Sequence, residues 1–298
     1  MTGIIPLKKE MNITSFFAVN KLRRIVGEKK AGHTGTLDPN ATGVLPVAFG
    51  GATRFIELLP THEKAYRATF KLGIETDTLD IWGNVTRTCD KTVSPQEVIA
   101  LKDKFLGEIK QLPPMYSALK KDGVRLYELA RKGEEVEREP RKCTIFELDI
   151  SEGDDGEYNL FCRCSAGTYI RTLISDIGDE LGTGAVMTSL ERTYACGVYL
   201  ENCYTLDEIA RLSEEGRLDE AVIPVDKLLE SYPAINVTDN QAVRFKNGGS
   251  LMAERVRQLN GHGLYRVYGK GDFLGIGEYL PDSDSLTVKR VFVNERTV

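Results

Sequence analysis

The sequence of 298 residues predicts an α+β fold with a small, β-rich domain at its C-terminal end. Helical and strand patterns follow one another through residues 1–233, whereas residues 234–298 contain short strand patterns separated by Gly, Asp and Ser. The apolar content of 41% and the charged content of 28% are typical of a globular chain. A chain of this length buries enough surface to fold without disulfides or a structural metal.

The N-terminal part is expected to form a helix and then a loop. Thr14 and Ser15 offer an N-cap, apolar residues follow at helical spacing, and Gly27 is placed to end the helix. Residues 31–55 are rich in Gly, Thr and Pro, so we expect a loop there. Within it, Pro39 disfavours helical geometry at Asp38.

The middle of the chain alternates between strands and helices. Ser94 and Glu97 form a capping box that predicts a helix from Pro95 to about residue 109. Other elements are expected in this order: a half-buried strand over 66–72, a short helix over 124–131, a charged surface connection over 134–142, a strand over 158–164, and a helix over 170–181 that Gly182 closes.

A domain boundary is predicted near Pro233, which gives two domains of residues 1–233 and 234–298. Residues 201–232 are acidic and helical in pattern, and the pattern changes abruptly after them. Three short strands are then expected, over residues 264–268, 273–280 and 286–293.

Charge is distributed unevenly along the chain. The formal net charge of −5 argues mildly against a nucleic-acid partner, because phosphate binding requires Lys and Arg. However, residues 1–71 carry a net charge of +6 and residues 234–298 carry +2, while the segment between them is acidic. A polyanion can contact the basic ends and avoid the middle. A solvated mixed surface fits the same distribution, so both interpretations stay open.

Several classes of site find no support in the sequence. The three histidines stand at no metal-binding spacing, and neither GxxxxGK[ST] nor GxGxxG after a strand occurs. We therefore expect no metal and no cofactor. No apolar run reaches the ~18 residues of a membrane span, and no signal peptide is apparent. The six cysteines form no CxxC pair, so we expect free thiols and a cytoplasmic protein.

One segment combines groups that can carry out chemistry. Residues 32–39, GHTGTLDP, place the His33 imidazole and the Asp38 carboxylate five residues apart on a glycine-rich loop. Glycine lets such a backbone approach a ligand closely. The carboxylate can serve as a nucleophile or a general base. An aspartate that only stabilises a turn is the alternative that these residues leave open.

Residues 32–43, GHTGTLDPNATG, resemble the signature loop of the TruB family of tRNA pseudouridine-55 synthases. The resemblance extends through most of the chain. Further segments that resemble family motifs are Tyr66 with LGIETDTLD (72–80), QLPPMYSALK (111–120), GTYIR (167–171) and LERT (190–193). Residues 234–298 resemble a PUA-type RNA-binding domain.

The resemblance implies a pseudouridine synthase catalytic fold, which is a mixed, largely antiparallel sheet flanked by helices, with an insertion at about residues 86–142. It also implies that uridine at position 55 in the T-loop of tRNA is flipped out and isomerised without metal, redox partner or cofactor. The expected partner is the T-arm stem-loop of tRNA. No protein partner is expected, and nothing demands more than a monomer.

The matched positions imply roles for individual residues. Asp38 is the expected nucleophile, and attack on the base, attack on the sugar and removal of a sugar proton all fit the sequence. A charged carboxylate requires a nearby cation, and Arg171 matches the residue that pairs with it. Tyr66 matches the tyrosine that stacks on the target base, and it is a candidate to handle the C5 proton.

Six further residues are expected to bind the substrate: Tyr169 and Leu190 in the uracil pocket, His33 at the displaced base, Asp80 near the Tyr66 end of the site, and Lys9 and Lys120 at the RNA backbone. Extruding a base costs a few kcal/mol, and stacking it on an aromatic ring returns roughly 1–3 kcal/mol. Stacking on His33 and Tyr66 would therefore offset much of the cost of flipping.

The chain departs from the family pattern in two places. Glu10 and Asn12 replace the proline and glycine that usually follow the lysine of the opening segment, and Glu191 stands where a basic residue is common. The first departure concerns the loop that opens the site, and the second concerns one phosphate contact.

Three other functions are considered: a non-catalytic protein that binds or folds tRNA, an RNA-guided synthase of the dyskerin family, and a retaining glycosidase. The glycosidase would require the carboxylates of Asp38 and Asp80 about 5 Å apart and a sugar cleft. The single tryptophan, Trp82, gives little support for a sugar cleft. The combination of Asp38, Tyr66 and Arg171 disfavours a protein that only binds RNA.

Overall fold

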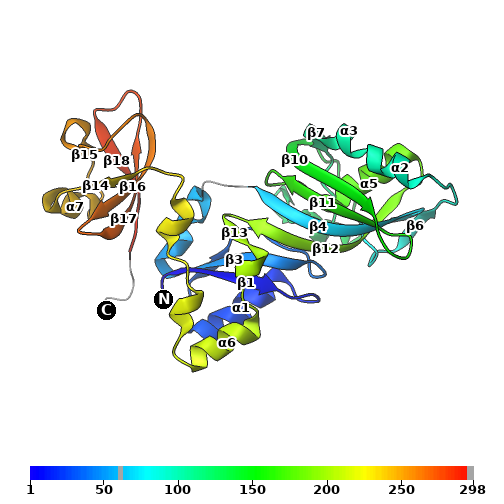
Figure 1. Cartoon of the computed structure of the whole chain (residues 1–298), viewed down its shortest axis with the longest axis horizontal. Coiled ribbons are helices and arrows are strands. Elements are labelled where there is room, and N and C mark those ends of the chain that lie inside the picture. Colours follow the sequence, from blue (N-terminus) through cyan, green and yellow to red (C-terminus); the bar gives the residue numbers. More distant parts are fainter. Residues whose placement is uncertain (60–62, 294–298) are drawn as a thin grey trace.

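The computed structural model describes residues 1–59 and 63–293. Figure 1 shows a larger lobe, built from a long mixed sheet with helices against it, and a smaller lobe formed by the C-terminal strands. The predicted α+β class with a β-rich C-terminal part is therefore confirmed.

The sheet of the larger lobe has the strand order β1-β3-β12-β4-β11-β10-β7, with β2 paired to β3 and β13 paired to β12. These strands are β1 (Gly3–Lys9), β2 (Ala31–His33), β3 (Thr42–Phe49), β4 (Lys64–Leu72), β7 (Gly107–Gln111), β10 (Arg141–Glu152), β11 (Tyr158–Cys164), β12 (Ala185–Ala195) and β13 (Val198–Tyr199). Paired neighbours are antiparallel except β3 and β12, which are parallel. Two hairpins stand apart: β5 (Ile74–Thr76) with β6 (Val85–Thr88), and β8 (Lys120–Lys121) with β9 (Val124–Arg125).

Helices connect the strands of this lobe, and most of them contribute residues to the core beside the sheet. They are α1 (Ser15–Val26), α2 (Pro95–Ala100), α3 (Lys102–Phe105), α4 (Leu126–Ala130), α5 (Ile170–Leu181) and α6 (Leu206–Glu214), with 3-10 segments at Gly50–Leu58, Leu200–Asn202, Leu218–Ala221 and Val225–Leu229. Leu22 of α1, Phe70 of β4 and Ile174 of α5 are completely buried in one cluster. The cluster fixes the start of α5 relative to the middle of the sheet, where the candidate site lies.

The predicted ends of α1 and α5 are confirmed by their cap geometry. Thr14 Oγ1 accepts a hydrogen bond from the Phe17 amide at 3.0 Å. Gly27 and Gly182 adopt φ angles of 69° and 70°, a left-handed conformation that glycine reaches at little cost. Local sequence is sufficient for these predictions because a cap depends on residues within one turn.

Two predicted segments are wrong. Residues 31–55 do not form one loop, because β2 and the almost completely buried β3 enclose a short loop of residues 34–41. An interior strand is apolar on both faces and lacks alternation, so its pattern is easily missed beside Gly and Pro. The helix predicted to residue 109 ends at Phe105, because Gly107 adopts a φ of 85° and the chain then pairs as β7 with β10.

The smaller lobe contains β14 (Ala234–Asn236), α7 (Asp239–Lys246), β15 (Leu251–Met252), a 3-10 turn at Ala253–Arg255, β16 (Gly263–Gly269), β17 (Asp272–Tyr279) and β18 (Ser285–Val291). Its sheet has the order β14-β16-β17-β18-β15. Phe55 of the larger lobe packs on Phe273 and Phe292, with ring centroids 5.8 and 6.0 Å apart. β14 begins at Ala234, and our division of the chain at this point stays a prediction; residues 294–298 of the second domain lie outside the described residues.

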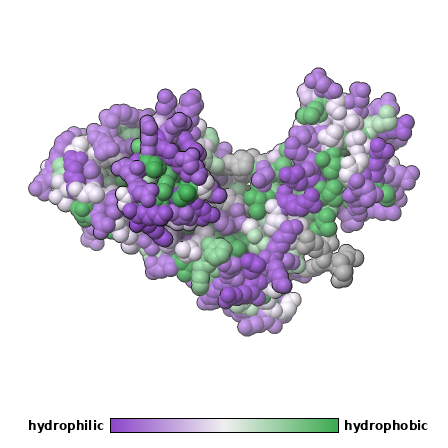
Figure 2. Space-filling view, turned by 180° about the vertical axis from the view of Figure 1, so that it is seen from behind, coloured by the Kyte–Doolittle hydropathy of each residue, from purple (hydrophilic) through white to green (hydrophobic). Residues whose placement is uncertain are grey.

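The surface is mostly polar. Figure 2 shows hydrophilic residues over most of the rear face, separate hydrophobic patches, and a hollow between the two lobes. Among the helices of residues 1–59 and 63–293, none is long and apolar enough to cross a membrane.

Candidate active site

The loop that carries Asp38 is held by buried hydrogen bonds immediately next to it. Ser15 Oγ donates to the Leu37 carbonyl at 2.9 Å and accepts from the Leu37 amide at 2.8 Å. On the other side, Lys9 Nζ donates to the Ala41 carbonyl at 2.6 Å. The backbone around Asp38 is therefore fixed, while its carboxylate stays 42% exposed.

Lys9 lies beneath this loop rather than at the surface. The residue is only 1% exposed, and its ammonium also donates to the carbonyls of Glu10 and Pro39. Burial lowers the pKa of Lys9 to about 8, although the nearby charge of Asp38 opposes this shift. In this position Lys9 cannot reach a phosphate, which corrects the expectation that it contacts the RNA backbone. It supports the loop instead.

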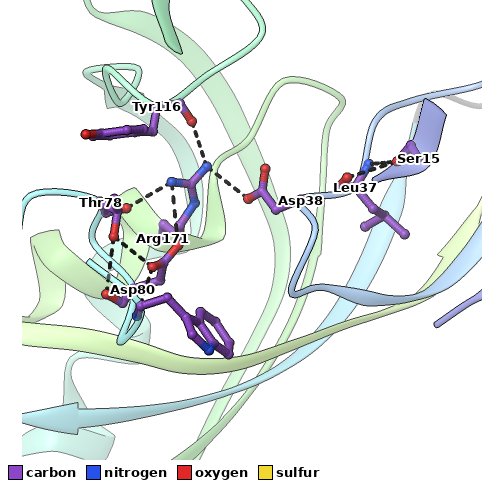
Figure 3. A network of polar contacts seen from close by, with 8 residues as sticks. Ser15, Leu37, Asp38, Thr78, Asp80, Tyr116 and Arg171 are labelled. Carbon is purple, nitrogen blue, oxygen red and sulfur yellow. Dashed lines mark hydrogen bonds and ion pairs between the residues drawn. The ribbon is translucent and has the colours of Figure 1, made fainter. Parts of the chain in front are cut away.

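Arg171, in the first turn of α5, points at Asp38 (Figure 3). Its Nη2 lies 2.9 Å from Asp38 Oδ2, and the side chain is only 6% exposed. Nη1 donates to the Thr78 carbonyl and Nη2 to the Tyr116 carbonyl, each at 2.9 Å. The structure thus brings together Asp38 and Arg171, which are far apart in the sequence, and fixes the guanidinium through three separate segments.

Asp80 lies on the other side of the same guanidinium (Figure 3). Its Oδ2 is 3.9 Å from Arg171 Nη1, and its Oδ1 accepts hydrogen bonds from Thr78 Oγ1 at 2.7 Å and from the Trp82 amide at 3.2 Å. Burial raises the pKa of Asp80, while Thr78 and Arg171 oppose the shift. Within the part of the chain that the structure describes, the carboxylate of Asp80 contacts Thr78, Trp82 and Arg171 rather than Tyr66.

A pocket of about 240 Å³ opens beside Asp38 and Arg171, and Tyr66, Tyr169 and Leu190 line it. Pairing of β4 with β12 explains why Tyr66 and Leu190 both face this pocket. Leu190 is opposite Ala68, so it faces the same side of the sheet as Tyr66, two residues earlier on β4.

Two tyrosines form part of the pocket wall. Tyr66 is 7% exposed, and burial raises its pKa to about 12 although the guanidinium of Arg192 opposes the shift. Tyr169 caps α5, and the Gln111 side chain holds its backbone by bonds of 3.0 and 3.2 Å to its amide and carbonyl. Burial also raises the pKa of Tyr169. Both phenols are therefore protonated at neutral pH.

Sequence reasoning missed two cations at the pocket. Lys64, two residues before Tyr66 on β4, lines the pocket. Arg192 lies directly opposite Tyr66 on β12 and is completely buried. Its Nε donates to the Val44 carbonyl at 2.8 Å and its Nη2 to the Gly35 carbonyl at 3.0 Å. Strand alternation from Tyr66 could have identified Lys64, whereas Arg192 requires knowledge of the strand register.

Two predicted substrate contacts lie away from the pocket. His33 ends β2 and does not line it; burial lowers the pKa of His33, and its Nδ1 has no hydrogen-bond partner. Lys120 is exposed on β8 and lines a separate cavity of about 360 Å³ with Arg138 and Arg141. Within residues 1–59 and 63–293, no group of three or more His, Cys, Asp or Glu side chains is placed to hold a metal ion.

Comparisons with known proteins identify the family of this chain. Residues 23–170 match the family model described as TruB family pseudouridylate synthase (N terminal domain). Residues 171–230 match the tRNA pseudouridylate synthase B C-terminal domain, and residues 233–292 match Pseudouridine synthase II TruB, C-terminal. The tRNA pseudouridine synthase B of Dechloromonas aromatica (strain RCB) is 45% identical over 278 residues, which cover 93% of this chain and 91% of that protein.

The chain belongs to the TruB family of pseudouridine synthases. A second TruB relative, tRNA pseudouridine synthase B of Clostridium perfringens (strain SM101 / Type A), is 40% identical and is covered completely. Among solved structures, a Cbf5-Nop10-Gar1 complex contains a chain that superimposes with a TM-score of 0.76 at 27% identity, covering 98% of this chain and 85% of that one. Family membership confirms the resemblance that rested on residues 32–43 and sets aside the glycosidase alternative.

Proposed function

We propose that this TruB-family chain converts uridine to pseudouridine at position 55 in the T-loop of tRNA, with Asp38 as the nucleophile. One observation carries the proposal: a half-exposed carboxylate stands 2.9 Å from a buried guanidinium at the edge of a pocket lined by Tyr66 and Leu190. Relatives named tRNA pseudouridine synthase B support tRNA as the substrate.

In this proposal the target uracil leaves its stack and enters the pocket, where Tyr66 provides an aromatic surface and Leu190 an apolar one. Extrusion costs a few kcal/mol, and stacking returns roughly 1–3 kcal/mol. The bond between C1′ and N1 then breaks, and both of its electrons stay on the base. Asp38 takes part by bonding to C1′, by removing a sugar proton, or by adding to the base before the bond breaks. After the base has turned, C5 bonds to C1′ as Asp38 leaves or returns the sugar proton; C5 gives up its proton and N1 gains one. Because the phenol of Tyr66 is itself protonated, Tyr66 is the candidate to relay the C5 proton by passing its own proton on.

Arg171 positions Asp38 for this reaction. Its guanidinium is fixed by the Thr78 and Tyr116 carbonyls and by Asp80, so one edge is presented to Asp38 before any substrate arrives. A charged hydrogen bond of this kind is stronger than a neutral one and directs the carboxylate. Geometry that is set in advance removes an entropic part of the barrier.

The remaining expectations concern RNA binding. Residues 234–298 are proposed to act as a PUA-like RNA-binding domain, and Lys120 with neighbouring Lys121 to contact the RNA backbone without reading its sequence. His33 is proposed to help displace the target base. We propose that the chain acts as a monomer in the cytoplasm and requires no protein partner.

The variant Asp38→Asn tests the proposal. The substitution keeps the size of the side chain but removes its nucleophilic oxygen, so release of tritium from C5-labelled uridine in a T-arm transcript should fall by at least about 10⁴-fold. RNA binding should survive. Asp149→Asn is the matched control, because Asp149 is 65% exposed and pairs with Lys102 at the surface.

Normal turnover by Asp38→Asn would refute the assignment of the nucleophile. If the unmutated chain binds the transcript tightly but releases no tritium, the result favours the alternative of a non-catalytic protein that binds or folds tRNA.

A further inference from the structure

Lys64 occupies a place in the pocket that the roles above leave unexplained. It lies on β4, the middle strand of the sheet, with Cys164 opposite it on β11 and Ala195 opposite it on β12. Side chains two residues apart on a strand face the same side, so Lys64 is directed like Tyr66. Both residues line the pocket at Asp38.

Among the described residues, no carboxylate forms an ion pair with Lys64, although the ammonium is largely buried. The charged or titratable groups around it are Arg192 on β12, His33 on β2, Cys164 on β11 and Cys196 after β12. Burial is the main cause that lowers the pKa of Lys64, and the Arg192 guanidinium lowers it further. A buried cation next to a second cation is unfavourable unless an anion joins them.

Arg192 shows the same lack of compensation. Its side chain is completely buried, two of its nitrogens bind backbone carbonyls, and Nη1 has no hydrogen-bond partner. The two cations lie close together next to Gly35. A Cβ atom built on Gly35 would be 3.1 Å from Lys64 Nζ and 3.6 Å from Arg192 Nη1, so both cationic groups approach the same point of the backbone. Both charges therefore meet beneath the loop that carries Asp38, and of the two only Lys64 is reachable from the pocket.

We propose that Lys64 donates a hydrogen bond to a carbonyl oxygen of the flipped uracil and stabilises the negative charge that develops there when the base separates from the ribose. This proposal rests on the proposed function. When the C1′–N1 bond breaks, its electron pair passes to N1 and spreads onto the O2 and O4 oxygens. Each of the three routes open to Asp38 generates this charge, and no oxidant or reductant is required.

The site favours the base over a backbone phosphate. Lys64 shares its strand face with Tyr66, the surface on which the ring stacks, whereas the open side of the pocket is at the half-exposed Asp38. In a pocket closed by a stacked base, a cation acts in a low dielectric and stabilises a forming anion strongly. The extra charge of Arg192 behind Lys64 adds to the same field.

The test compares Lys64→Met with Lys64→Arg on two T-arm transcripts, one with uridine and one with 5-fluorouridine at the target position. Fluorine makes the detached base a more stable anion, which therefore needs less help from a cation. On uridine RNA, Lys64→Met should lose about 10²-fold or more in the single-turnover rate, with RNA affinity nearly unchanged. Lys64→Arg should recover part of the loss because it keeps the charge.

On 5-fluorouridine RNA, followed by nucleoside chromatography after digestion, the loss in Lys64→Met should be clearly smaller. Lys71→Met is the matched control, because Lys71 is on the same strand but pairs with Glu157 at 3.6 Å near the surface. Retained thermal stability and RNA binding show that each variant is folded.

Equal losses on the two RNAs, or a loss confined to RNA affinity, would overturn the proposal; the second result would identify a phosphate contact. A rate for Lys64→Met within threefold of the unmutated chain would overturn it as well. If the unmutated chain itself fails to convert uridine RNA, the proposed function fails, which is a different result from any of these.

Discussion

Two buried arginines flank the pocket, and their surroundings differ. Arg171 meets two backbone carbonyls and two carboxylates, so its charge is compensated by Asp38 and Asp80. Arg192 donates to two backbone carbonyls, no carboxylate among the described residues forms an ion pair with it, and the Lys64 ammonium lies close to it. One cation therefore positions a carboxylate that belongs to the protein, while the other lies next to Lys64, and within residues 1–59 and 63–293 no carboxylate forms an ion pair with either Arg192 or Lys64.

The different surroundings of Arg171 and Arg192 indicate two different roles in one site. A compensated ion pair sets geometry, and it is complete before substrate binds. An uncompensated pair of cations costs stability in the free protein and becomes favourable only when a ligand brings negative charge. Such local conflict is expected at functional sites rather than in the structural core.

Among variants that test the difference between the two arginines, Arg171→Met is expected to lower the reaction rate most. The substitution removes the cation next to Asp38 and leaves the Thr78 and Tyr116 carbonyls without their donor. We expect a loss of about 10³-fold or more in single-turnover pseudouridine formation. Arg171→Lys should recover only part of it, because an ammonium cannot reproduce the planar fork.

Arg87→Met serves as the control for Arg171→Met, because Arg87 is 49% exposed and pairs with Glu75 on a surface hairpin. If Arg171→Met stays within tenfold of the unmutated rate while Arg87→Met is normal, the positioning role of Arg171 is wrong.

A smaller effect is expected from Asp80→Asn. The amide keeps the shape of the side chain and its acceptor oxygen, but it no longer attracts Arg171, so Asp38 is held less accurately. A rate loss of about 10-fold to 100-fold is expected. Because burial raises the pKa of Asp80, its carboxylate gains a proton at a higher pH than an ordinary aspartate. The rate should therefore fall as the pH decreases through this range.

The acid decline should be absent in Asp80→Asn, because the amide does not titrate. A pH–rate profile on the T-arm transcript measures both variants, and an unchanged acid decline in Asp80→Asn would show that another group causes it.

The smallest effect on the rate, less than about tenfold, is expected from Arg192→Met, which acts through its neighbours. Loss of the two carbonyl contacts should lower the free energy of unfolding by about 1–3 kcal/mol in urea titrations. Because the positive charge of Arg192 lowers the pKa of Lys64, the variant should also keep Lys64 protonated to a higher pH. The alkaline decline in the rate should then move to higher pH.

Arg217→Met is the control for Arg192→Met, because Arg217 is 55% exposed and pairs only with surface glutamates. An alkaline decline that moves to lower pH, or that does not move, would contradict the interaction between Arg192 and Lys64.

Predictions from the sequence succeeded where the controlling contacts are local. The caps at Thr14, Gly27 and Gly182 depend on one turn of chain, and the alternation around Tyr66 depends on one strand. They failed at β3 and β7, where pairing with distant strands overrides the local pattern. The burial of Lys9 was missed for the same reason, because the carbonyls of Pro39 and Ala41 reach it only after β1 and β3 have paired.

The sequence alone was sufficient for the α+β class and for the family, because the loop GHTGTLDPNATG and the later motifs are continuous in the chain. Only the tertiary structure placed Arg171 on Asp38, Asp80 on the far side of that guanidinium, and Lys64 with Arg192 beneath Gly35. The reason is physical: which side chains share a pocket depends on strand register and helix packing between distant segments, and no local pattern encodes that geometry.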